Sequence, residues 1–252
     1  PGDRWLLDRI AAWFRAPEAA HAPALTRFAQ LSAPIAARAV EDTAFYRYGR
    51  LLSRNDVGFD AGLLGLSPGT FHARMARRAR EQPNAMLATA THDHKRGEDV
   101  RARLAVLSAC ALDWALALTG WLADVATLAA EREMALPDPG DLAMLLQTIV
   151  GAWPVDRSLA AADDRQAFAD RLAAWQVKAL REAKHRTDWT CPDAGYERSA
   201  TDLTRLLLTD PDALPIRESI ARFAAQIGPA GVVNGLVQTA LKLTLPGVPY
   251  LY

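Results

Sequence analysis

The sequence predicts a mainly α protein with a few short strands: the last strands of an incomplete (β/α)8 barrel carrying a large inserted helical subdomain. Apolar runs end at clusters of charged residues over 34–43 and 86–96, as expected where parallel strands meet a polar site. From 98 to 243 the apolar residues recur at helical spacing, and a strand-like run follows at 245–251. Three strands do not form an independent parallel sheet of ordinary size, so we expect a larger barrel.

The predicted organisation has three parts. Residues 1–97 are expected to be a partial catalytic barrel segment, 98–243 a helical subdomain, and 244–252 a truncated last barrel strand. The chain begins with Pro1 and stops inside an apolar run at Tyr252. We therefore expect it to be a piece of a longer protein.

The elements follow in order from periodicity and turn residues. Helical spacing predicts helices over 5–14 and 23–31, and a proline-bounded apolar run predicts a buried strand over 34–40. Ser67-Pro68 is typical of a helix start, because serine caps free N–H groups and proline suits the first helical position. That helix is predicted to reach residue 82, with a strand after it at 86–90. Further helices are predicted over 98–108, 112–133, 139–150, 164–185, 197–208, 212–226 and 230–243.

Composition limits the classes of partner. The 252 residues carry 29 basic and 29 acidic side chains, so no net charge favours nucleic acid or an anionic membrane. The arginine-rich helix over 68–82 is more typical of a solvated face than of a nucleic-acid site. The longest apolar helix contains Asp113 and Asp124, so no membrane span is expected. Only two cysteines occur, which favours a reducing cytoplasm.

The stretch 86–101 is the clearest candidate functional site. Its apolar start leads directly into His92, Asp93, Lys95 and Arg96, before a helix begins. Ionisable groups at the end of a buried strand are typical of chemistry in parallel α/β folds. Histidines at 92 and 94 would alternate faces on an extended segment and have no cysteine or third histidine nearby. We therefore expect no metal at this site.

Several blocks of this sequence resemble the malto-oligosyltrehalose synthases, a family of the α-amylase superfamily (glycoside hydrolase family 13). They cover essentially the whole chain, in the same order as in that family. The blocks are Glu-Asp-Thr-Ala-Phe-Tyr-Arg-Tyr at 41–48, Leu-Ser-Arg-Asn-Asp-Val-Gly at 52–58, Met-Leu-Ala-Thr-Ala-Thr-His-Asp at 86–93, Lys-Arg-Gly-Glu-Asp-Val-Arg-Ala-Arg-Leu at 95–104 and Leu-Pro-Gly-Val-Pro at 245–249.

The resemblance implies an enzyme of malto-oligosaccharides that works without a cofactor. Its reaction converts the reducing-end α-1,4 linkage into an α,α-1,1 linkage by intramolecular transglucosylation. By the same resemblance, Asp93 is the third catalytic carboxylate and hydrogen-bonds sugar hydroxyls beside the reacting carbon, with His92 supporting these contacts. Such bonds strengthen in an oxocarbenium-like transition state. The nucleophile and the acid/base are expected on earlier barrel strands, so this chain alone is expected to be inactive.

Further residues are expected to bind the substrate. Lys95 and Arg96 are placed to orient Asp93 and to donate to sugar hydroxyls. The aromatic side chains of the 41–48 block are candidates for stacking on sugar rings, although part of this set is expected to be core. These rings are Phe45, Tyr46 and Tyr48, with Glu41, Asp42 and Arg47 as polar partners.

Departures from the family pattern keep other hypotheses open. Asp56 stands where the family usually has Glu, His94 where it has Thr, and Tyr250 where it has Asp. One alternative is an α-amylase-like hydrolase or a 4-α-glucanotransferase. Another is a non-catalytic helical carbohydrate-binding or interaction module. The tryptophans at 114, 121, 153 and 175 are expected in the core, whereas Trp189 lies in a polar loop and has no assigned role.

Overall fold

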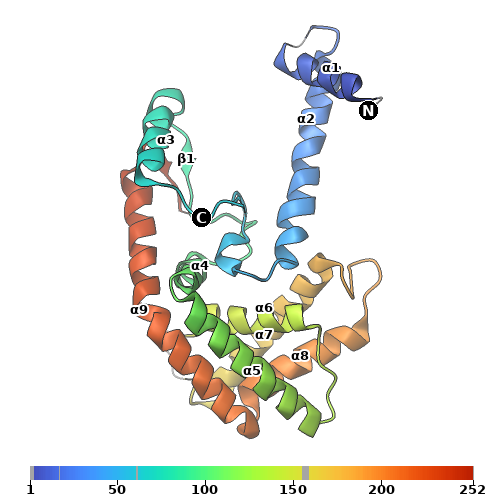
Figure 1. The fold of residues 1–252 in the computed structure, drawn as a ribbon, viewed down its shortest axis with the longest axis vertical. Coiled ribbons are helices and arrows are strands. Elements are labelled where there is room, and N and C mark those ends of the chain that lie inside the picture. Colours follow the sequence, from blue (N-terminus) through green and yellow to red (C-terminus); the bar gives the residue numbers. More distant parts are fainter. Residues whose placement is uncertain (1–2, 17, 61, 155–158, 252) are drawn as a thin grey trace.

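In the computed structural model, two arms rise from a body of packed helices (Figure 1). One arm is formed by α1 and α2, and the other by α3, the strands and the end of α9. The structure describes residues 3–16, 18–60, 62–154 and 159–251. The helices are α1 (Arg4–Arg15), α2 (Ala22–Ala36), α3 (Pro68–Glu81), α4 (Glu98–Ala105), α5 (Ala111–Glu131), α6 (Pro139–Ala152), α7 (Ala162–Ala183), α8 (Ala194–Thr209) and α9 (Leu214–Thr244).

Short helical turns and two strands complete the described chain. The strands are β1 (Met86–Leu87) and β2 (Val248–Pro249). The turns are a π-helical turn η1 (Ala37–Glu41) and the 3-10 turns η2 (Ala44–Tyr46), η3 (Leu52–Arg54), η4 (Val106–Ser108) and η5 (Pro211–Ala213). The mainly helical prediction with a few short strands is therefore confirmed.

The helix signals of the sequence correspond closely to the observed helices. The predicted helices between 98 and 208 match α4 with η4, then α5 to α8, within a few residues at each end. Ser67 caps α3 as expected: its hydroxyl accepts the backbone N–H of Thr70 at 3.2 Å, and Pro68 is the first helical residue.

The strand predicted over 34–40 is wrong. This segment continues α2 to Ala36 and then forms η1, with Pro34 inside the helix. Its alanines are strong helix formers, and in the described structure the segment has no strand beside it to pair with. An apolar run of this length is equally compatible with a helix, so sheet partners decide its conformation.

The break predicted between two helices at Gly228-Pro229 is also wrong. The chain forms a single helix, α9, of 31 residues, with Pro229 inside it. Figure 1 shows α9 bent near its middle. Proline removes one hydrogen bond of the helix and kinks it without ending it when packing holds both halves.

The two strands form a parallel pair. Met86 is in register with Val248 and Leu87 with Pro249, and the Tyr250 N–H donates to the Leu87 carbonyl at 2.9 Å. Gly247 precedes β2 with a φ of 139°, and a Cβ there would lie 2.7 Å from the carbonyl oxygen of Ala85. Glycine is therefore required where β2 approaches β1.

The hydrophobic core lies within the helical body. Leu104 of α4, Ile149 of α6 and Leu203 of α8 are completely buried there. Trp114 and Trp121 of α5 are buried in the same core, with ring centroids 5.9 Å apart. Trp153 and Trp175 are partly buried against core clusters, so the prediction that these four tryptophans serve packing is confirmed.

Helix α5 is also long and apolar enough to cross a membrane, by length and composition alone. It carries Asp113 and Asp124, and one side of it buries Trp121, Val125 and Leu128 in the core. A core helix of a helical body meets the same length and composition criteria.

Candidate functional site

Asp56 organises the candidate site, although the sequence analysis assigned it no role there. Its carboxylate is completely buried. It accepts the backbone N–H groups of Val57 at 2.8 Å, Lys95 at 2.9 Å and Arg96 at 3.2 Å. The guanidinium Nε of Arg101 lies 3.6 Å from the same carboxylate. One side chain from the turn-rich 55–62 segment thus fixes the loop that carries His92 and Asp93.

Thr89 ties the end of β1 to α4 and α9. Its carbonyl accepts a hydrogen bond from Arg101 and its hydroxyl donates to Glu98. The hydroxyl also accepts from the Lys242 ammonium at 3.1 Å, and this lysine is buried. Contacts with α4 and α9 therefore fix Thr89, and the polar loop begins directly after this fixed residue.

His92 and Asp93 lie exposed on this held loop. The His92 Nε2 atom is 3.5 Å from the Asp93 Oδ2 atom, and both side chains are about two-thirds exposed or more, at 71% and 65%. The Asp93 N–H donates to the Thr91 hydroxyl at 3.4 Å. The two residues of the predicted catalytic pair are thus adjacent and accessible to a ligand, on a loop that the buried Asp56 supports.

His94 is the inward member of the loop. Its Nδ1 accepts the Thr91 N–H at 2.9 Å, which requires this nitrogen to be unprotonated. Burial lowers the pKa of His94 below its ordinary value, against an opposing effect of Asp56. His94 therefore braces the turn as a neutral ring while His92 faces outward.

Lys95 and Arg96 are less accessible than their proposed sugar contacts require. The Lys95 side chain is only 7% exposed, and its ammonium binds the Asp42 carboxylate at 2.5 Å. Arg38 binds the other oxygen of Asp42 at 2.8 Å. Arg96 is buried above the Trp175 ring, 5.7 Å from its centroid, and burial lowers the pKa of its guanidinium to about 10.

The 41–48 block divides into packed and exposed residues. Phe45 and Tyr46 are 4% and 3% exposed, and burial raises the pKa of Tyr46 to about 12. These exposures favour the core alternative for both rings and leave Tyr48, 45% exposed, as the ring with a free face. Glu41 accepts the Gly58 N–H at 3.1 Å, which joins the block to the segment of Asp56.

Arg47 connects this block to the helical body. Its Nε donates to the Ala183 carbonyl at 2.6 Å and its Nη2 to the Lys184 carbonyl at 3.4 Å, at the end of α7. The Lys184 ammonium in turn donates to the Thr43 hydroxyl at 3.1 Å. The structure therefore brings the end of α7, which sequence reasoning did not select, beside the predicted site.

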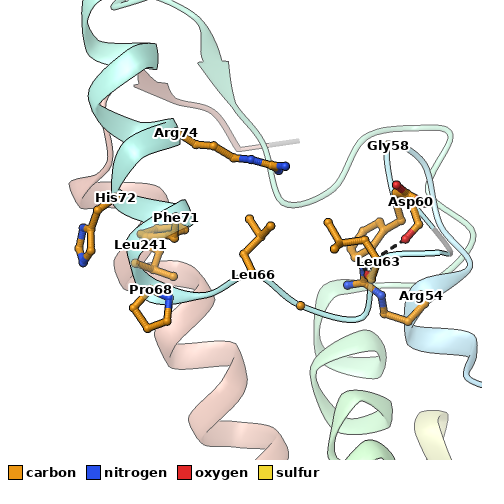
Figure 2. Close-up of a pocket in the computed structure, with 12 residues that line it drawn as sticks. Arg54, Gly58, Asp60, Leu63, Leu66, Pro68, Phe71, His72, Arg74 and Leu241 are labelled. Atoms are coloured by element: carbon orange, nitrogen blue, oxygen red, sulfur yellow. Dashed lines mark hydrogen bonds between the residues drawn. The ribbon is translucent and has the colours of Figure 1, made fainter.

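A separate hollow of about 640 Å³ lies between the 54–66 segment and α3 (Figure 2). Arg74 extends across it from α3, and Phe71 packs near Leu241 of α9. Arg54 donates to the Leu63 carbonyl at 2.5 Å on the far side. Residues 92–96 are not among its described lining residues, so this hollow is distinct from the candidate site.

In the described part of the chain, no group of three or more His, Cys, Asp or Glu side chains is placed to hold a metal ion. The two cysteines, Cys110 and Cys191, are both free thiols.

Comparisons with known proteins give similarity over nearly the whole chain. No family model matches. A putative maltooligosyl trehalose synthase of Mycobacterium tuberculosis (strain CDC 1551 / Oshkosh) is 35% identical over 226 residues, which are 90% of this chain and 27% of that protein. The solved maltooligosyltrehalose synthase of Arthrobacter ramosus is 36% identical, with a TM-score of 0.76, over 91% of this chain and 27% of that one.

A third similarity comes from a different source organism. The crystal structure of a hypothetical maltooligosyl trehalose synthase of Sulfolobus tokodaii is 33% identical, with a TM-score of 0.73, over 85% of this chain and 28% of that one. The chain thus spans about a quarter of the length of the relatives it matches. The resemblance inferred from the sequence is confirmed: this chain is similar, over nine-tenths of its length, to one segment of the maltooligosyl trehalose synthases.

Proposed function

We propose that this chain contributes part of the active site of a malto-oligosyltrehalose synthase, an intramolecular glycosyltransferase of the isomerase class. The proposed reaction converts the reducing-end α-1,4 linkage of a malto-oligosaccharide into an α,α-1,1 linkage. The observation that carries the proposal is the His92-Asp93 pair, exposed on a loop whose backbone is held by the buried Asp56. The similarity to maltooligosyl trehalose synthases supports this choice of reaction.

Asp93 has the properties that a transition-state contact needs. Its carboxylate is exposed, its N–H donates to Thr91, and Asp56 binds the N–H groups of Lys95 and Arg96 just after it. A carboxylate on such a supported loop can accept hydrogen bonds from the hydroxyls next to the reacting carbon, and these bonds strengthen as positive charge develops there. His92 lies close enough to support the same contacts.

In this proposal, some of the surrounding residues contact the sugar and others hold the site in place. Asp42 and Lys95 form one ion pair in which the Lys95 side chain is only 7% exposed, so we propose that Lys95 orients Asp42, whose carboxylate accepts hydrogen bonds from sugar hydroxyls. Arg96 and Arg47 act from behind, by packing on Trp175 and by docking the end of α7. Tyr48 is the aromatic ring available for stacking.

The architecture we propose is the final part of a (β/α)8 barrel with a helical insertion, with domains at 1–97, 98–243 and 244–252. The parallel pairing of β1 with β2 across the helical body supports this arrangement. The nucleophile and acid/base are proposed to lie on other barrel strands, so that this chain alone does not turn over substrate. We propose a cytoplasmic location, no cofactor, and no nucleic-acid or membrane partner.

The decisive experiment uses the complete reading frame that contains this chain, with maltopentaose as substrate. We expect a product with a non-reducing trehalose end and no released glucose. Asp93→Asn is expected to abolish this product while leaving the urea unfolding midpoint unchanged, because the side chain is exposed. Near-normal product formation by this variant would refute the assignment of Asp93.

The same product analysis separates the alternatives. An α-amylase-like hydrolase would release new reducing ends, and a 4-α-glucanotransferase would redistribute chain lengths while keeping reducing ends. A non-catalytic module would bind maltopentaose without any product, even in the complete reading frame.

A further inference from the structure

Lys184 adopts a backbone conformation that its side chain disfavours. It follows the last residue of α7 with φ 54° and ψ 38°, in the left-handed region. Glycine or asparagine usually occupies this position after a helix, because a Cβ is crowded there. Among the described non-glycine residues, Glu133 has the same kind of conformation, with a φ of 52°. Strained positions of this kind are enriched at functional sites, although a helix end also explains them.

The contacts of Lys184 direct its ammonium to the predicted site. Arg47 donates to the carbonyls of Ala183 and Lys184 and thereby fixes the end of α7. The exposed Lys184 side chain then extends to Thr43, whose hydroxyl accepts from Nζ at 3.1 Å. Backbone contacts hold the chain here, so the ammonium itself is not needed to dock the helix end.

The position of Thr43 brings Lys184 beside the charged pair of the site. Thr43 follows Asp42, whose carboxylate is already neutralised by Lys95 at 2.5 Å and Arg38 at 2.8 Å. An ammonium has three donors, and the contact with Thr43 uses one of them. The remaining donors of an exposed lysine are suited to neutral acceptors such as sugar hydroxyls.

We propose that Lys184 is a further malto-oligosaccharide-binding residue, contributed to the site by the helical body. This inference rests on the proposed function for its ligand class. It assigns the end of α7 a role in substrate binding. The other predicted site residues all come from segments 41–48 and 92–96. Its chemistry is hydrogen-bond donation from the ammonium to a hydroxyl of the bound saccharide.

Substitution by glycine tests the proposal without disturbing the fold. Lys184→Gly removes the ammonium, relieves the left-handed strain and keeps the carbonyl that Arg47 binds. In the complete reading frame, we expect the Kd for maltopentaose, measured by calorimetry, to rise about tenfold, as for loss of one charge-assisted hydrogen bond. Lys184→Arg retains a donor cation and is expected to bind within about threefold of the unsubstituted protein.

Glu133→Gly is the matched control, because it relieves the same strain away from the site. It is expected to leave the Kd unchanged, and both glycine variants are expected to unfold in urea at midpoints no lower than the parent protein. An unchanged Kd in Lys184→Gly would overturn the role of Lys184. A lowered unfolding midpoint of Lys184→Gly would also overturn this role, because it would assign the side chain to folding. An equal rise in Kd for the glycine and arginine variants would overturn it as well.

These outcomes are separable from the proposed function. If Lys184→Gly binds normally while Asp93→Asn forms no trehalose end, the function stands and the role of Lys184 is refuted. If the parent protein itself does not bind maltopentaose, both the function and the inference that rests on it are refuted.

Discussion

Asp56 accepts the backbone N–H of Lys95 at 2.9 Å, although 39 positions of sequence separate the two residues. The same carboxylate accepts the N–H of Arg96 and faces the guanidinium of Arg101. A single buried negative charge therefore replaces the regular partners that a sheet or helix would provide for this loop. Several consequences of this and of neighbouring close contacts are measurable in the chain itself.

Asp56→Asn is expected to destabilise the protein by about 3 kcal/mol, because it removes the buried carboxylate that lies against the buried Arg101 guanidinium. Urea unfolding measures this free energy. Asp170→Asn provides the control, since Asp170 pairs with Arg205 on the surface, and we expect its effect on the free energy of unfolding to be much smaller. Equal effects of the two substitutions would show that the Asp56 charge is not essential to the loop.

The stability of the loop is expected to fall at acidic pH through His94. Burial lowers the pKa of this histidine in the folded state below the unfolded value of 6.5, so the unfolded state binds more protons near that pH. The contribution is complete above pH 6.5 and is lost as pH falls through the folded pKa. His94→Gln should reduce the difference between unfolding free energies at pH 7.5 and pH 5. His92→Gln is the neighbouring control, and an equal reduction there would contradict the assignment to His94.

Gly231 and Gly228 offer a paired test of the contact between α4 and α9. A Cβ on Gly231 would lie 2.9 Å from the Cα of Arg103, whereas a Cβ on Gly228 would meet nothing within 4 Å. We expect Gly231→Ala to destabilise the protein by about 1–3 kcal/mol through overpacking. Gly228→Ala should have the smaller effect, within about 1 kcal/mol, because its Cβ meets no other part of the fold and the helix preference of alanine is offset by Pro229 directly after it. Thermal unfolding of the two variants checks the order.

Gly247→Ala is expected to open the strand pair locally. The new Cβ would lie 2.7 Å from the Ala85 carbonyl oxygen, in a backbone conformation that L side chains rarely adopt. The Tyr250 amide, which donates to Leu87, should then exchange with solvent at least about tenfold faster in hydrogen-exchange NMR, as for a local cost above about 1.4 kcal/mol. Gly65→Ala, where a Cβ has open space, serves as the control. An unchanged Tyr250 exchange rate would mean that the strands tolerate a wider spacing.

The helices of the helical body were largely predictable, because they have strong apolar periodicity and clear breakers. Outside the helical body, Ser67 caps α3 as its sequence indicates. The conformation of the 34–40 segment could not be predicted, since an apolar alanine-rich run takes its conformation from its neighbours. The helix end predicted at Pro229 was wrong for a related reason: packing keeps α9 continuous through a residue that usually ends a helix.

The exposed loop of the candidate site could be selected from local sequence, but the residues that support it could not. His92 and Asp93 were selected because they lie where an apolar run becomes polar. Asp56 and Lys184 make their contacts across 39 and 141 positions of sequence, and no local pattern signals contacts at such a separation. Burial of Phe45, Tyr46 and Arg96 likewise depends on helices that are distant in the chain.

The parallel pairing of β1 with β2 places the entry and the exit of the helical body at one location. α4 starts shortly after β1, α9 ends shortly before β2, and Gly231 allows these two helices to touch. Both ends of the intervening helical segment are therefore attached at the strand pair. We expect that insertions or deletions in loops of this segment that lie far from the strands, for example between α5 and α6, leave the strand register unchanged. These loops can then vary in evolution while the His92-Asp93 loop stays in place.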